Sequence, residues 1–140
     1  MLFTIDVTIP KSTTEVDPTV SILPIAHGII TEFKVRPRPG HAGLAHCVIL
    51  HHEHQVAPST ENMDLHGDTY PIDWNEYYES YQPPYELKIK GWNDDDTYPH
   101  TFTIAVVVLP RKAVLALSIV DAIKGVFGML SPRRIFTRKE

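Results

Sequence analysis

The sequence predicts an all-β protein, an antiparallel β-sandwich of jelly-roll or immunoglobulin-like type, followed by a C-terminal α-helix. Three observations lead to this fold class. Apolar and polar residues alternate in several short runs, which is the pattern of half-buried strands. Most of the 12 prolines lie at the ends of apolar runs, where they interrupt strand pairing. Beyond residue 110 the apolar residues instead recur with a helical period.

The first half of the chain contains four predicted strands. Residues 3–9 alternate strictly and end at a proline. Residues 19–23 and 29–36 follow, and a proline stops each of them. Residues 44–52 are almost continuously apolar in the middle, as expected of a strand buried in the core of a sandwich.

The second half of the body is less regular before it becomes regular again. Residues 73–79 fit either one short strand or one helical turn. Residues 85–90 and 101–109 alternate as strands, and the acidic loop at 93–96 is expected to join them in a hairpin. Carboxylates of such a loop could bind a hard cation, but the loop lacks the glycine and the distal glutamate of an EF-hand, so a solvated loop is favoured. Residues 1–109 thus hold about seven strands in one domain.

Residues 110–132 are predicted to form an amphipathic helix. From residue 113 to residue 130, 13 of 18 residues are apolar, and the remainder form one narrow polar stripe. The helix is expected either to cover one sheet of its own sandwich or to pack between copies of the chain or onto another protein. The predicted contact residues are Leu115, Ile119, Ile123, Val126, Phe127 and Leu130.

A membrane is the alternative partner of this helix. Asp121 and Lys124 lie centrally in it and oppose a crossing, whereas basic residues flank it at both ends. Residues 113–130 are therefore better suited to contact with a membrane surface than to a span.

Charge is distributed unevenly along the chain. Residues 1–109 hold 6 Lys/Arg and 15 Asp/Glu, a net charge of −9, whereas residues 110–140 hold 7 and 2, a net charge of +5. The acidic body opposes binding of nucleic acid, and the basic tail at 133–140 offers at most non-specific phosphate contacts. No specific nucleic-acid partner is predicted.

The stretch LHHEH at residues 50–54 resembles a metal site. Strand alternation through this stretch would place His52 and His54 on one side as a candidate metal-binding pair. A cupin-type metalloenzyme would need further ligands, and the spacing of this signature fails at two places, so His66 or His100 would have to complete the site. We expect a histidine cluster at a surface or subunit contact instead, and no metal.

Aromatic residues crowd the irregular region. Trp74, Tyr77, Tyr78 and Tyr81 suit a subunit interface or packing of the loop on its own sandwich, and a carbohydrate-binding module is the further alternative. No nucleophile with a plausible base and no phosphate-binding loop occurs, so the sequence predicts no catalytic residue, no enzyme and no cofactor.

The single cysteine, Cys47, lies in an apolar run and is expected to be a small buried residue. The first ten residues have neither the basic region nor the apolar core of a signal peptide. The sequence therefore predicts a protein that stays in a reducing compartment or is released by lysis.

The body of the chain, residues 1–109, resembles the small β-sandwich virion proteins of tailed phages and related viruses. The resemblance is carried by the initial strand, by GIITEFKV at residues 28–35 and by the block PYELKIKGWNDDDT at residues 84–97. It implies a capsid decoration protein, a head–tail adaptor or a tail component. It also implies a place in the virion, assembly in the host cytoplasm, and partners that are copies of the chain and other virion proteins. It transfers no catalytic residues.

Overall fold

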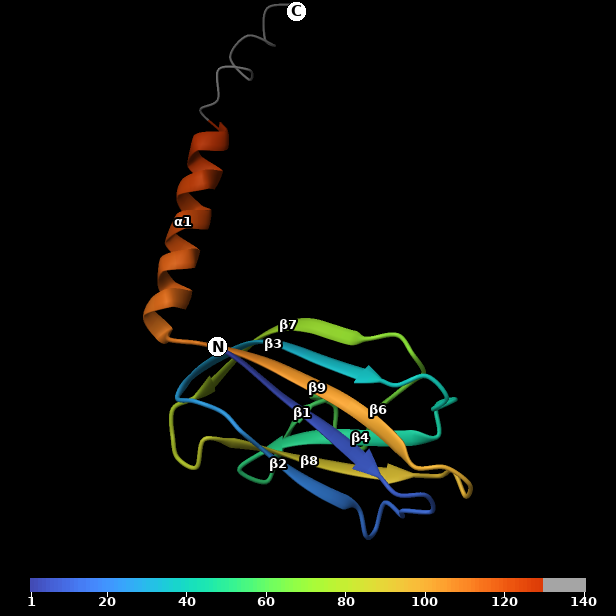
Figure 1. Ribbon diagram of the computed structural model, residues 1–140. Helices are drawn as coiled ribbons and strands as arrows, with labels where there is room; N and C mark the ends of the chain where they lie inside the picture. The colour runs from blue at the N-terminus through green and yellow to red at the C-terminus, as the bar shows by residue number, and fades with distance from the viewer. Residues whose placement is uncertain (130–140) are drawn as a thin grey trace, which may run out of the picture.

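A computed structural model describes residues 1–129 and shows a β-sandwich with one C-terminal helix (Figure 1). The predicted fold class is confirmed. The strands and the helix are β1 (Leu2–Ile9), β2 (Thr19–Pro24), β3 (Gly28–Pro37), β4 (Ala45–His51), β5 (His54–Ala57), β6 (Leu65–His66), β7 (Ile72–Ser80), β8 (Glu86–Asn93), β9 (His100–Leu109) and α1 (Arg111–Met129).

The two sheets have the topology of a jelly roll, an alternative that the sequence left open. One sheet has the order β1-β9-β3-β7, and the other has β2-β8-β4-β5 with the short β6 paired to β4. Strands pair as in one long hairpin that has been rolled up: β1 with β9, β2 with β8, β3 with β7 and β4 with β5. This nested antiparallel pairing distinguishes a jelly roll from the immunoglobulin arrangement.

The core lies between the two sheets and follows the predicted alternation. On β9 the buried apolar residues are Phe102, Ile104, Val106 and Val108, the face expected from the sequence. Phe33 of β3, the strand next to β9, and Ile89 of β8, in the facing sheet, belong to the same core cluster and are fully buried. Apolar side chains therefore fill the interior of the roll.

The predicted hairpin of the last two strands is wrong. β8 pairs with β2 and β4, whereas β9 pairs with β1 and β3 in the other sheet. The acidic loop therefore crosses from one sheet to the other. β8 also continues through Trp92 and Asn93, which were expected in the loop. Alternation predicts a strand but contains no information about its partner, so adjacency in sequence was a poor guide here.

The structure also settles one open alternative and corrects two expectations. Residues 72–80 form a strand, which was one of the two alternatives for residues 73–79. β4 ends at His51, one residue before the predicted end, and the chain then turns back into β5. Nine strands replace the seven expected within the described residues, because β5 and β6 are too short to show alternation.

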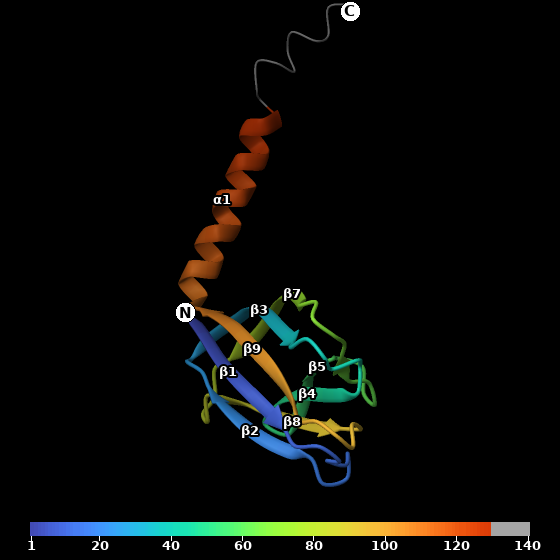
Figure 2. The same ribbon diagram turned by 45° about the vertical axis from the view of Figure 1, so that its right-hand side comes forward.

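Helix α1 extends away from both sheets, and the two views in Figures 1 and 2 agree on this. The expectation that it covers a sheet of its own sandwich is therefore wrong. The helix begins at Arg111, one residue after the predicted start at residue 110, and its contact with the sandwich is at its base, near β3. Leu130 and the predicted basic tail lie outside the described residues.

Candidate functional site

The histidine-rich stretch forms the tight turn between β4 and β5. His51 pairs with His54 across the hairpin, and His52 and Glu53 occupy the two central positions with φ of 49° and 63°. Positive φ at both positions is the geometry of a type I′ turn, which is the favoured two-residue connection of a hairpin. The strand does not run through residue 54, so the alternation that placed His52 and His54 on one face is wrong.

The side chains of this turn point to different partners. His52 stacks on His51 with ring centroids 3.9 Å apart, and its Nε2 lies 3.2 Å from the carbonyl oxygen of Pro84. Glu53 pairs with Lys88 of β8, and His54 is exposed. Among residues 1–129, His52 and His54 belong to no group of converging metal ligands.

His51 is the buried member of the stretch. Its Nδ1 lies 2.9 Å from the hydroxyl of Tyr78 on β7, and this contact links the two sheets at one edge. Burial lowers the pKa of His51, and the neighbouring His52 lowers it further. Burial also raises the pKa of Tyr78. Both groups are therefore held in their neutral forms, and the contact is a structural hydrogen bond.

The four aromatic residues predicted for an interface do not form one surface. Trp74 and Tyr78 are half-buried on the inner side of β7, whereas Tyr77 points outward. Trp74 stacks on Phe33 at 5.2 Å, and Tyr81 stacks on His27 at 5.1 Å. Packing of this segment on its own sandwich explains three of the four. A flat platform for a sugar ring would need several exposed rings side by side, and these residues do not provide it.

The acidic loop uses its polar groups to hold its own conformation. The buried Asn93 donates from Nδ2 to the carbonyl of Tyr98 at 3.0 Å. The carboxylate of Asp95 accepts from the amide of Thr97 and from Nε2 of His100, both at 2.8 Å. The Thr97 amide and the His100 ring hold the pKa of Asp95 below its usual value. These contacts give the crossing between the sheets a defined path.

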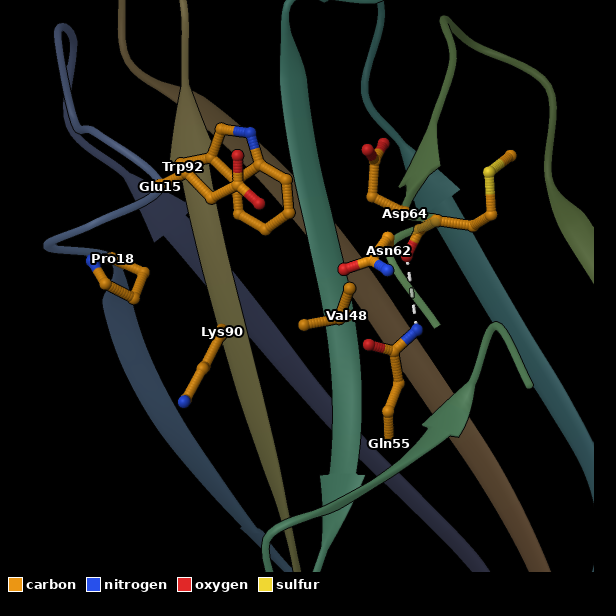
Figure 3. Close-up of a pocket in the computed structure, with 9 residues that line it drawn as sticks. Glu15, Pro18, Val48, Gln55, Asn62, Asp64, Lys90 and Trp92 are labelled. Carbon is orange, nitrogen blue, oxygen red and sulfur yellow. Dashed lines mark hydrogen bonds between the residues drawn. The ribbon is translucent and has the colours of Figure 1, made fainter. Parts of the chain in front are cut away.

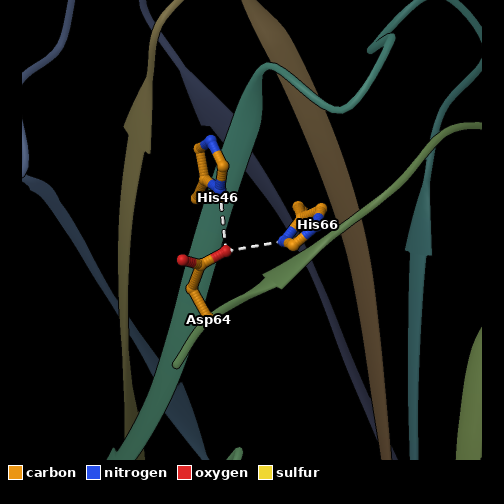
Figure 4. A group of neighbouring side chains, drawn as sticks. All are labelled: His46, Asp64 and His66. Carbon is orange, nitrogen blue, oxygen red and sulfur yellow. Dashed lines mark hydrogen bonds and ion pairs between the residues drawn. The ribbon is translucent and has the colours of Figure 1, made fainter. Parts of the chain in front are cut away.

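A different group of side chains brings metal-type ligands together. Nδ1 of His46 and Nδ1 of His66 lie 2.7 and 2.8 Å from the same oxygen, Oδ1 of Asp64 (Figure 4). Partial burial raises the pKa of Asp64, but the hydrogen bonds from both imidazoles outweigh it and the pKa is lowered overall. His66 was considered with His52, but the structure places it with His46. The missing signal was the pairing of β6 with β4, which no local pattern encodes.

A shallow cleft of about 180 Å³ adjoins this group on the outer face of the second sheet (Figure 3). Trp92 and Lys90 of β8 line it together with Asp64. Gln55 lies below the loop, and its Nε2 is within 3.2 Å of the carbonyls of residues 58, 60 and 63. This side chain anchors the loop that carries Asp64.

Helix α1 presents the largest group of exposed apolar side chains among the described residues. They cover the predicted contact face and extend beyond it. The exposed large apolar residues are Leu115, Leu117, Ile119, Val120, Ile123, Val126 and Phe127. Within residues 1–129, no helix is long and apolar enough to cross a membrane.

Cys47 is fully buried, as expected, and burial raises the pKa of its thiol, so this cysteine is not a reactive nucleophile.

No protein-family model matches the chain, and a search of curated proteins gives no significant match.

Proposed function

We propose that this chain is a structural protein that assembles into a larger particle. The jelly-roll body supplies a rigid module, and α1 supplies the contact between copies. The observation that carries the proposal is the row of exposed apolar side chains on a helix that leaves the body. Monomeric soluble proteins rarely expose contiguous apolar patches of this kind unless the patch binds something.

The helix lacks local features that would stabilise it alone. Arg111 and Lys112 place positive charge in its first turn, where the helix dipole disfavours it, and no acidic residue is present there. Most of the stability of a helix in a protein comes from the tertiary packing of its apolar face and not from intrinsic helix propensity. Burial of each large apolar side chain would contribute about 1.5–3 kcal/mol. The stability of α1 is therefore expected to come from a partner.

The width of the apolar face favours further copies of α1 as that partner. At about 100° per residue, six of the seven exposed apolar side chains lie within an arc of about 140° that begins at Leu115 and ends at Val120. The seventh, Leu117, lies outside this arc. A two-helix seam needs a narrower stripe, so this arc suits contact with more than one neighbouring helix. Copies of one chain would supply such a bundle, with Ser118, Asp121 and Lys124 on its outer surface.

A virion is the particle that the sequence resemblance suggests, as a decoration protein, adaptor or tail component. Jelly rolls build viral capsid domains, and they also build lectins and cupins. The fold is thus compatible with this role without specifying it, and the particle is proposed from the resemblance together with the exposed helix.

Light scattering of the full chain and of a truncation ending at Pro110 tests the proposal. We expect a defined oligomer for the full chain and a folded monomer for the truncation. Two neighbouring substitutions provide a matched pair: Ile119→Asp should dissociate the oligomer, whereas Ser118→Asp on the polar stripe should not. A full chain that is monomeric would contradict the proposal and indicate a solitary module. A monomeric chain that also binds phospholipid vesicles through α1 would contradict it and indicate a membrane-surface protein.

A further inference from the structure

The outer face of the second sheet carries three metal-type ligands that converge. They are the two Nδ1 atoms of His46 and His66 and a carboxylate oxygen of Asp64, and one ligand atom from each residue lies within 4.8 Å of the others. We propose that His46, Asp64 and His66 bind one divalent transition-metal ion, with Zn²⁺ as the best chemical match. This site differs from the LHHEH turn and from the interior of the roll.

The main chain places these ligands. His46 and His66 are directly opposed in the antiparallel pairing of β4 and β6, so both imidazoles stand on the same face of the sheet. Asp64 immediately precedes β6, and Gln55 anchors the loop before it. The convergence of the three side chains is therefore a consequence of strand register and does not depend on the chance orientation of one flexible loop.

The imidazole of His46 is oriented from its far side. Its Nε2 lies 3.1 Å from Oδ2 of Asp94, and its ring stacks on Trp92 with planes 12° apart and centroids 5.5 Å apart. Metal-binding histidines commonly donate their second ring N–H to a carboxylate, which fixes the tautomer and the ring direction. Asp94 is in this position, so His46 would present Nδ1 to the ion.

The two imidazoles approach one carboxylate oxygen from two different strands. Nδ1 of His46 lies 2.7 Å and Nδ1 of His66 lies 2.8 Å from Oδ1 of Asp64. Neutral imidazole carries one N–H, so His46 donates to only one of its two carboxylate neighbours, Asp64 and Asp94. With the N–H at Nε2, toward Asp94, the lone pair of Nδ1 is available to a metal ion.

The donor set determines the class of ion. Two imidazole nitrogens and one carboxylate oxygen suit Zn²⁺ and related transition metals rather than Ca²⁺ or Mg²⁺, which prefer oxygen ligands alone. Tetrahedral Zn²⁺ would place neighbouring ligand atoms about 3.3 Å apart. Each Nδ1 would then move about half an ångström away from Oδ1 of Asp64, and the two Nδ1 atoms, which lie within 4.8 Å of each other, would take the same spacing. His66 is half-exposed, so a fourth ligand, water or a group from another molecule, can reach the ion from solvent.

Calorimetric titration of ZnCl₂ into the full chain, produced without a histidine tag and treated with chelator, tests the inference. We expect one ion per chain and a rise in the melting temperature on binding. His66→Ala and Asp64→Asn should each weaken binding at least about 100-fold, and Asp94→Asn should weaken it about 10–100-fold through loss of orientation. His54→Ala is the matched control, because it removes an exposed histidine of the turn and should leave binding unchanged.

A second readout identifies the coordination. Co²⁺ in the same chain should give the visible absorption of a tetrahedral site, and His66→Ala should abolish it. Circular dichroism of each variant checks that the fold is retained. If His66→Ala disturbs the fold, Asp64→Asn still tests the site, because asparagine has nearly the same shape as aspartate. Absence of stoichiometric binding would overturn the assignment. Binding that survives both ligand substitutions, or that His54→Ala removes, would also overturn the assignment.

Discussion

Gly91 of β8 lies directly against Ile9 of β1, and a Cβ added at Gly91 would lie only 2.4 Å from Cδ1 of Ile9. The two residues belong to different sheets, and Ile9 is fully buried. A side chain as small as a methyl group at position 91 would therefore force the sheets or the isoleucine to move. This contact makes the packing of the two layers directly testable.

We expect Gly91→Ala to destabilise the fold by about 1–3 kcal/mol, the usual cost of overpacking a core. Urea unfolding monitored by tryptophan fluorescence or circular dichroism measures the change. Ile9→Val removes the Cδ1 atom that would clash, so the double variant should lose less free energy than the sum of the two single variants. Simple additivity would show that the two residues do not meet.

The hydrogen bond between His51 and Tyr78 provides the second prediction. Tyr78→Phe would leave His51 without a hydrogen-bond partner at Nδ1, and Nε2 of His51 already has none among the described residues. An unsatisfied buried polar atom costs about 1–3 kcal/mol, so we expect a loss of that size in chemical denaturation.

Tyr77→Phe is the matched control for that experiment. The hydroxyl of Tyr77 contacts Glu79 on the outer side of the same strand, and its loss should change stability by no more than about 0.5 kcal/mol. Equal effects of the two substitutions would contradict the inward orientation of Tyr78.

His41 should make stability depend on pH. Its Nε2 donates to the carbonyl of Thr101 at 2.8 Å, and Nδ1 is buried without a hydrogen-bond partner in the described part of the chain. Burial lowers the pKa of His41 below its ordinary value of 6.5, and the nearby His100 lowers it further. The unfolded chain therefore binds the proton more readily than the folded one, and stability is complete above 6.5 and is lost as pH falls toward the folded pKa.

Denaturation at about pH 7.5 and about pH 5, with chelator present, measures this dependence. His41→Gln retains a nitrogen donor toward Thr101 but does not titrate, so it should lose less stability than the parent chain over this interval. Asp64, Asp68 and Asp95, whose pKa values are lowered, stay ionised throughout and contribute little. The same loss in both proteins would show that other groups cause the dependence.

Much of the candidate chemistry could not be predicted from the sequence, although each residue type was visible. The candidate pair His52 and His54 was chosen on alternation, but a two-residue turn interrupts the strand between them. His46 and His66 are twenty positions apart, and only the register of β6 on β4 brings them together. Asp94, which orients His46, comes from the loop that crosses between the sheets.

The sequence by itself determined the class of the protein: strands from a period of two, a terminal helix from a period of 3.6, and Cys47 in the core. These features are local, because apolar periodicity specifies which face of an element is buried. Only the tertiary structure decided that the strands roll into a jelly roll, that β8 and β9 lie in different sheets, and that α1 leaves the body. Pairing between distant strands is set by the packing of the whole core, and periodicity cannot express it.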